Sequence, residues 1–141
     1  MVQKKYKKVL IVFSNFYPEI SQNLVDGAES YLKRKDISFE KKSVNGSLEI
    51  PFLLLKYKNE YSGFIVLGCV IKGETDHYKI VRDVSFKKIY SIAYDESLPL
   101  GSALLTVKNY EQAVERSDIN KKNLGEKAAI VCCNLMVSLG C

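Results

Sequence analysis

The sequence alternates short, continuous apolar runs with longer segments in which apolar residues recur at helical spacing. The apolar runs occupy residues 9–13, 64–71 and 103–107. Runs this short and this apolar are typical of strands that are covered on both faces, as in a parallel sheet. A more polar strand is predicted at 37–44, at or near an edge of the same sheet.

Amphipathic helices are predicted between and after these strands. The helix after the first strand has an apolar face made of Leu24, Ala28, Tyr31 and Leu32. A short helix should follow Pro51, because proline is favoured in a first helical turn. A long helix from Thr75 onward has a face made of Val81, Ser85, Ile89 and Ile92. Two helices end the chain, and the last places Ala128, Cys132, Leu135 and Leu139 at helical spacing.

This alternation predicts an α/β fold with right-handed crossovers and a parallel sheet that carries helices on both faces. The length of 141 residues fits a single domain spanning residues 1–141. Residues 1–8 form a basic N-terminal segment that we expect to be flexible. With 47% hydrophobic and 26% charged residues, the chain lacks the composition of an intrinsically disordered protein.

The formal net charge of +5 lies mostly in short lysine clusters near residues 4–8, 33–35 and 121–122. Clusters this short are typical of solvated strand and helix ends. The alternative is a nucleic-acid surface, but neither aromatic-basic interleaving nor zinc-finger spacing supports it. We therefore expect no nucleic-acid partner.

The four cysteines are Cys69, Cys132, Cys133 and Cys141. They form no C-x-x-C pair and the chain has one histidine, so we predict no metal site. The first three lie in apolar segments and are interpreted as core residues of a protein in a reducing compartment. The apolar run at 9–13 is too short for a membrane span or signal peptide, which predicts a soluble, cytoplasmic protein without a membrane partner.

A ligand site is predicted where the strands end, because ligands of open α/β sheets bind beyond the carboxyl ends of the strands. The segments at these ends are 14–16, 45–49, 72–77 and the turn around Asn109. In the third segment, Gly73 would let a ligand approach the backbone, and Thr75 could cap a helix whose N-terminus favours an anion. The alternative is an ordinary strand-to-helix turn. His77 suits proton transfer at neutral pH, or is a structural histidine.

Three further residues have both a functional and a structural interpretation. Phe16 could stack on a flat heterocycle or belong to the core. Glu49 could contact a ligand or only the dipole of a helix start. Arg116 could bind phosphate through two parallel donors or lie exposed on its helix. The sequence has no P-loop and no G-x-G-x-x-G, so neither a nucleoside triphosphate nor a dinucleotide is indicated.

Many of these residues belong to motifs that follow one another in a set order. The motifs are Phe16, Gly46-Ser47-Leu48-Glu49-Ile50-Pro51, Gly68-x-Val70-Ile71-Lys72-Gly73-x-Thr75-x-His77-Tyr78, Leu105-Thr106-Val107, Glu111-Gln112-Ala113 and Arg116. In this order and spacing the chain resembles the lumazine synthase family over residues 9–139.

The resemblance implies an enzyme of riboflavin biosynthesis with a flavodoxin-like three-layer sandwich and a four-stranded parallel sheet. The family condenses 5-amino-6-(ribitylamino)uracil with 3,4-dihydroxy-2-butanone 4-phosphate to 6,7-dimethyl-8-ribityllumazine, releases phosphate and water, and needs no cofactor. The resemblance also implies homopentamers with active sites shared between adjacent subunits. A 60-subunit shell and riboflavin synthase as a partner are compatible with it. The alternative is a ligand-binding or assembly protein on the same scaffold with reduced catalysis.

By position, the resemblance assigns roles to matching residues. The ring and ribityl chain of the first substrate would contact Phe16, Ser47, Leu48, Glu49, Val70 and Ile71. The phosphate would bind Glu74, Thr75 and Arg116, the last from the neighbouring subunit. His77 would transfer protons.

Two positions depart from the family pattern. Ser102 stands where a phenylalanine often covers the heterocycle from the neighbour. Leu124 replaces a lysine before the last helix, and Lys127 stands where an acid is usual. Since 124 and 127 are one turn apart, we hypothesise that Lys127 restores the missing cation, the alternative being a solvent-exposed lysine.

Overall fold

The computed structural model describes residues 8–73 and 77–141, and strands and helices alternate along them. The strands are β1 (Val9–Ser14), β2 (Phe39–Val44), β3 (Gly63–Ile71) and β4 (Leu100–Val107). The helices are α1 (Pro18–Arg34), α2 (Ile50–Tyr57), α3 (His77–Glu96), α4 (Tyr110–Ser117) and α5 (Leu124–Leu139), with a 3-10 turn, η1 (Ser47–Glu49), before α2.

The four strands form one parallel sheet in the order β2-β1-β3-β4. The two strands with the most continuous apolar sequence, β1 and β3, lie in the middle, and each has a single residue that is not fully buried, Phe13 in β1 and Ile71 in β3. The polar strand β2 lies at an edge, as predicted. Because all strands point the same way, their carboxyl ends meet at one edge of the sheet.

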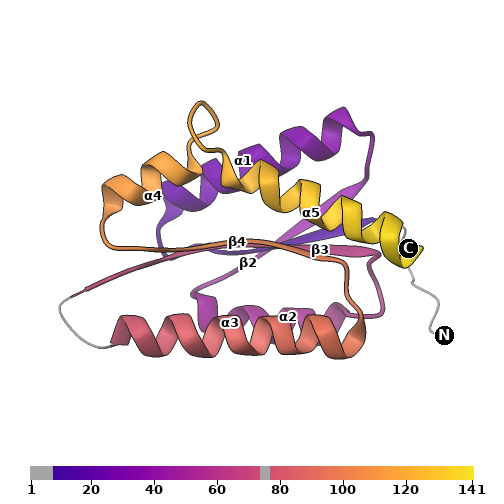
Figure 1. Cartoon of the computed structure of the whole chain (residues 1–141), viewed down its shortest axis with the longest axis horizontal. Helices are drawn as coiled ribbons and strands as arrows, with labels where there is room; N and C mark the ends of the chain where they lie inside the picture. Colours follow the sequence, from indigo (N-terminus) through magenta and orange to yellow (C-terminus); the bar gives the residue numbers. More distant parts are fainter. Residues whose placement is uncertain (1–7, 74–76) are drawn as a thin grey trace.

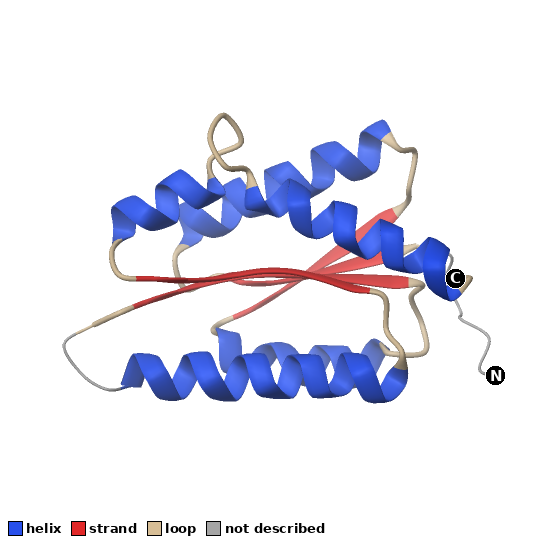
Figure 2. Cartoon of the chain, in the orientation of Figure 1, coloured by secondary structure: helices blue, strands red, loops and turns tan. Residues whose placement is uncertain are grey.

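Helices cover both faces of the sheet and complete a three-layer α/β sandwich (Figures 1 and 2). One layer holds α1, α4 and α5, and the other holds α2 and α3. Each layer packs against its own apolar cluster, one including Leu24, Leu67 and Ala128 and the other including Leu54, Phe64 and Ile89. The predicted fold class is therefore confirmed.

Several details of the predicted elements needed correction. The strand β4 begins at Leu100, three residues before the predicted start at 103, because Gly101 already lies under α5. On α5, Ala128 and Cys132 are buried as predicted, but Leu139 is half exposed, since the helix continues beyond the end of the sheet (Figure 1). The predicted helix start at Thr75 lies outside the described residues.

The cysteine predictions hold in part. Cys69 and Cys132 are buried in the core, whereas Cys133 is only half-buried. In the described ranges, no helix combines the length and apolar character that a membrane span requires.

Candidate active site

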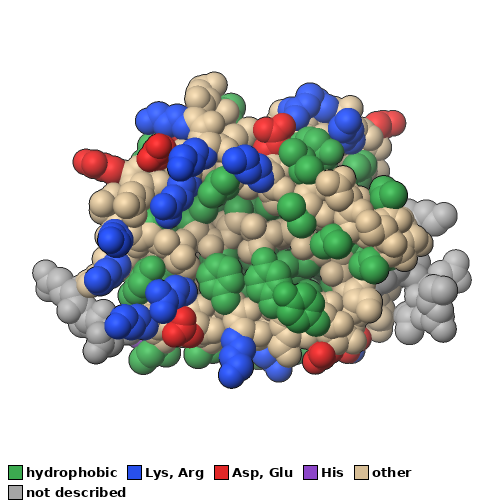
Figure 3. All heavy atoms as spheres, viewed as in Figure 1, with side chains coloured by type: hydrophobic (Ala, Val, Ile, Leu, Met, Phe, Trp, Pro, Cys, Tyr) green, Lys and Arg blue, Asp and Glu red, His purple; other side chains and the backbone are tan. Residues whose placement is uncertain are grey.

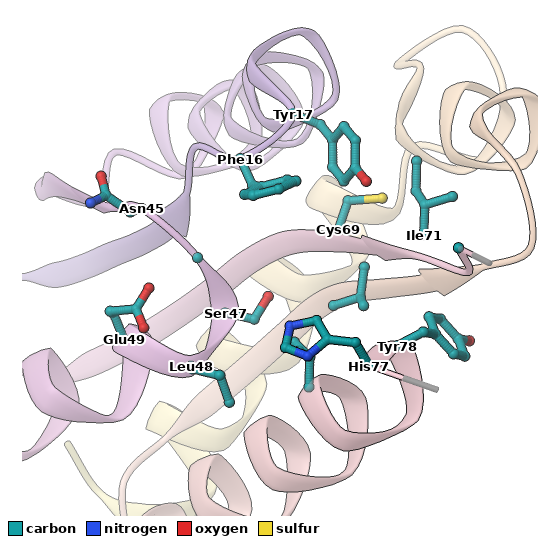
Figure 4. A pocket seen from close by; sticks show the side chains of 14 residues that line it. Phe16, Tyr17, Asn45, Ser47, Leu48, Glu49, Cys69, Ile71, His77 and Tyr78 are labelled. Atoms are coloured by element: carbon teal, nitrogen blue, oxygen red, sulfur yellow. The ribbon is translucent and has the colours of Figure 1, made fainter. Parts of the chain in front are cut away.

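A cavity of about 360 Å³ opens at the edge of the sheet where β1, β2 and β3 end (Figure 4). The residues around it come from the loop after β1, the turn and η1 after β2, the end of β3 and the first turns of α3. They are Phe16, Tyr17, Asn45, Gly46, Ser47, Leu48, Glu49, Cys69, Val70, Ile71, Gly73, His77, Tyr78 and Val81. The rule that ligands bind beyond the strand ends thus predicted the position of the cavity. Residues at three of the four strand ends, those of β1, β2 and β3, line it.

Phe16 lies in the loop between β1 and α1, and 66% of its surface is exposed. Its ring stands over one side of the cavity, and His77 projects from the opposite side (Figure 4). The ring of Tyr17 packs edge to face against the ring of Phe16, with centroids 5.0 Å apart and an interplanar angle of 72°. Phe16 is therefore not a core aromatic, and its exposed ring faces the cavity.

The turn after β2 supplies the polar part of the cavity wall. Gly46 is extended, and the Glu49 N–H donates to its carbonyl at 3.1 Å, which closes the 3-10 turn η1. Within this turn Ser47 is buried, while Leu48 and Glu49 are exposed. The buried Ile50 then begins α2 and anchors the turn in the core.

The end of β3 presents its backbone to the cavity. The β1–β3 pairing ends at Phe13 and Leu67, whereas β3 continues to Ile71 and pairs with β4 up to Val107. From Gly68 to Ile71 the strand therefore has a strand partner on one side only. The backbone donors and acceptors on its other side have no strand partner, and groups of this kind can bind the polar edge of a planar ring.

His77 is the first residue of α3 and is exposed at the cavity. The next residue, Tyr78, is half-buried and lies under the Arg82 guanidinium, with Cζ 5.4 Å from the ring centroid. Val81, one turn along α3, lines the same cavity. The imidazole thus projects from a helix whose inner face is held by the sheet.

Burial determines which other groups here can react. It raises the pKa of the Cys69 thiol to about 12, so this thiol stays protonated at neutral pH and is a poor nucleophile. Burial also raises the pKa of Tyr17, with a smaller contribution from Cys69. Among the described lining residues, the other polar side chains are those of His77, Tyr78, Asn45, Ser47 and Glu49. Within the described ranges, no cluster of three or more His, Cys, Asp or Glu could hold a metal ion.

Three predicted site residues lie away from this cavity in the same chain. Ser102 pairs with Val66 in the sheet, four residues before Val70, which places it about 13 Å down the strand. Its hydroxyl accepts a hydrogen bond from the Leu104 N–H at 3.3 Å. Arg116 is half-buried in the last turn of α4. Lys127 is exposed on α5, whereas Leu124 packs against the apolar cluster under α1.

Two further predicted residues, Glu74 and Thr75, lie outside the described residues. Sequence reasoning missed other residues of the wall, above all Tyr17 and Cys69. Both are direct neighbours of predicted residues, so adjacency to Phe16 and Val70 was the available signal. Tyr78 stood in the motif without an assigned role.

Comparison of the sequence with known proteins identifies the family. The sequence model of the 6,7-dimethyl-8-ribityllumazine synthase family matches residues 6–139. The chain belongs to this family. A family member from Bartonella tribocorum is 40% identical over 129 residues, covering 89% of this chain and 85% of the relative. One from Agrobacterium fabrum is 37% identical over 142 residues, covering 94% and 96%. Both are named 6,7-dimethyl-8-ribityllumazine synthase.

Proposed function

We propose that this chain condenses 5-amino-6-(ribitylamino)uracil with 3,4-dihydroxy-2-butanone 4-phosphate. The product is 6,7-dimethyl-8-ribityllumazine, with release of phosphate and water, in riboflavin biosynthesis. Family membership over nearly the whole chain supports this transferase activity. The observation that carries it is the cavity with Phe16 on one side and His77 on the other.

The pyrimidine ring is proposed to stack on Phe16. The exposed ring provides a flat apolar surface, and the one-sided end of β3 provides backbone groups at Val70 and Ile71 for the polar edge of the uracil. An aromatic stack together with backbone hydrogen bonds fixes the orientation of a flat, polar heterocycle. The ribityl chain then extends toward η1, where Ser47, Leu48 and Glu49 line the cavity.

His77 is proposed as the proton-transfer residue. The amine of the pyrimidine attacks the carbonyl of the second substrate, and water leaves as the imine forms. Elimination of phosphate then leaves an enol that tautomerises to a second carbonyl. The ribityl-bearing nitrogen attacks this carbonyl, and a second water leaves as the ring closes. Each step moves protons between nitrogen, carbon and oxygen, which an imidazole at the cavity can accept and return. The enclosing wall contributes by holding the two substrates together.

The phosphate site is proposed to be completed by a second subunit. Among the lining residues that the structure describes, none is Lys or Arg, although the second substrate carries a phosphate. Arg116, and Lys127 in place of the cation lost at 124, would reach the cavity from the neighbour, with Glu74 and Thr75 on the near side. Ser102 would face the heterocycle from that neighbour as well. This arrangement fits a ring of subunits, and we propose a homopentamer.

The larger assembly and the cellular setting follow the family. A shell of 60 subunits and an association with riboflavin synthase remain compatible with such a pentamer. The free cysteines suit a reducing cytoplasm. We propose that no cofactor takes part, because every step is an addition, an elimination or a proton transfer.

The test is product formation from the two substrates, followed by absorbance. His77→Asn keeps the size of the side chain and removes the titratable group, so we expect the turnover number to fall about 100-fold or more. Lys87→Gln, an exposed position farther along α3, is the matched control and should keep the wild-type rate. Binding of both substrates without product would instead favour the ligand-binding alternative. A molar mass of five chains in sedimentation tests the pentamer.

A further inference from the structure

Three aromatic rings, those of Phe16, Tyr17 and Tyr110, form an aromatic wall, of which Phe16 and Tyr17 line the cavity and Tyr110 lies beyond it. Phe16 meets Tyr17 edge to face at 5.0 Å, and Tyr17 meets Tyr110 at 6.5 Å with an interplanar angle of 65°. Both distances and angles are those of favourable edge-to-face pairs. The wall joins the loop after β1 to the first residue of α4, two segments that are far apart in the sequence.

The outer end of the wall is attached to α1. The Tyr110 hydroxyl donates a hydrogen bond of 3.1 Å to the Glu19 carboxylate in the first turn of α1. The start of α4 is itself held by the Asn109 side chain, which accepts from the Gln112 N–H at 2.9 Å. Tyr110 is therefore fixed at its backbone by the helix cap and at its hydroxyl by Glu19.

Tyr17, the middle ring, connects the fixed ring of Tyr110 to Phe16 at the cavity. Tyr17 is half-buried and packs against the apolar cluster under α1, whereas Phe16 and Tyr110 are 66% and 42% exposed. Its hydroxyl end lies toward Cys69, so the ring runs along the cavity wall (Figure 4). An exposed phenylalanine ordinarily exchanges between rotamers, and fixing one of them before binding removes an entropic cost.

We propose that Tyr110 and Glu19 act through Tyr17 to hold the Phe16 ring in the orientation that receives the pyrimidine. Tyr17, Tyr110 and Glu19 are thus positioning residues for the proposed reaction, on which this inference rests. The wall acts on the pyrimidine side of the cavity. It should therefore affect binding of the pyrimidine substrate and leave the affinity for the phosphate substrate unchanged.

The experiment measures the dissociation constant of the pyrimidine substrate alone, together with KM for each substrate and kcat. Tyr17→Leu should weaken pyrimidine binding about three- to tenfold, the range that loss of one aromatic pair gives. Tyr17→Phe keeps the ring and should restore wild-type affinity. Tyr110→Leu and Glu19→Gln should show the same effect in smaller degree, because these residues lie two and three contacts from Phe16.

The matched control is Glu111→Gln, an exposed acid in the first turn of α4 that does not belong to the wall. It should leave all constants unchanged. Unchanged pyrimidine binding in both Tyr17→Leu and Tyr110→Leu would overturn the positioning role, as would an equal loss of affinity for both substrates. Lack of product with the wild type would overturn the proposed reaction instead, and pyrimidine binding would still test the wall.

Discussion

The two helical layers differ in how completely one chain packs them. On the α1 and α5 side, backbones approach so closely that glycine is required. A Cβ atom on Gly101 would lie 1.8 Å from the Ala128 carbonyl oxygen, and one on Gly125 would lie 2.1 Å from that of Leu24. On its outer face, α1 carries polar pairs such as Gln22 with Asp26. The inner contacts of this layer are therefore fixed within one chain, although its outer face also exposes apolar side chains such as Val131 and Val137.

The α2 and α3 side is packed on its inner face but apolar on its outer face as well. An open groove of about 200 Å³ between the two helices is lined mainly by apolar residues, namely Leu48, Pro51, Phe52, Leu55, Val84, Ser85 and Lys88. Phe52 is 71% exposed and Val84 is 52% exposed. Because Leu48 lines both this groove and the cavity, a subunit that covered the groove would also adjoin the site.

On another side of α3, Phe86, Tyr90 and Tyr94 follow one another with ring centroids 6.3 and 5.9 Å apart. Figure 3 shows hydrophobic side chains gathered between α3 and β4. A cyclic ring needs two different, complementary patches on each subunit. The contrast between the layers shows that α2 and α3 have two functions. Their inner faces form part of the core, and in the proposed pentamer their outer faces would form a subunit contact.

The largest expected effect is on the close contact between α5 and β4. Gly101→Val should destabilise the fold by on the order of 4 kcal/mol or more, because the new side chain meets a backbone carbonyl that cannot move without shifting α5. Urea unfolding followed by circular dichroism measures this loss. Gly73→Ala is the control, since a Cβ there meets nothing within 4 Å. An unfolding midpoint near that of the wild type would show that the α5 contact is not tight.

A second variant tests the inner face of the other layer. Leu54 is fully buried in the cluster under α2 and α3. Leu54→Ala should cost about 3 kcal/mol, because it removes buried methyl groups and leaves a cavity. The comparison is with Phe52→Ala on the same helix, which should change monomer stability by less than about 0.5 kcal/mol. Equal costs for the two variants would contradict the two-faced description of α2.

A third prediction concerns alkaline pH and again the contact between α5 and β4. Burial raises the pKa of the Cys132 thiol from 9.0 to about 12. The folded protein therefore keeps this proton after the unfolded chain has lost it. The stabilisation that this burial provides is complete below pH 9 and is lost as pH rises through 12. At pH 10.5 the loss is roughly 2 kcal/mol.

Urea unfolding between pH 8 and 10.5 measures this loss, and Cys132→Ala should flatten the profile by that amount. Cys141→Ala, at an exposed cysteine, is the matched control. A Cys132→Ala profile parallel to that of the wild type would contradict the assignment.

These layers also show what could be predicted from the sequence. The strands β1 and β3 were predictable, because an uninterrupted apolar run of this length fits a strand buried on both faces. The early start of β4 and the exposure of Leu139 were not, because both depend on how far α5 extends across the sheet. Periodicity assigns a face to a helix but does not say where its neighbour ends.

The candidate site divides in the same way. Phe16, Glu49 and His77 were predictable from the strand-end rule and line one cavity. The roles of Tyr17 and Tyr110 were not, because their rings meet only when the starts of α1 and α4 are brought together. In the single chain Ser102 and Arg116 lie away from the cavity, so their predicted roles depend on a second subunit.

The smallest expected effect on folding concerns the exposed outer face of α2 and α3. Replacing Phe52 and Val84 by serine should leave the stability of the isolated chain within about 0.5 kcal/mol, because both side chains are more than half exposed. The same change removes apolar surface that a second subunit would bury, so the assembly should dissociate at a higher protein concentration. Sedimentation over a dilution series separates the two effects. If the double variant kept wild-type assembly, the groove would not be part of the subunit contact, and the open face of α2 and α3 would need another explanation.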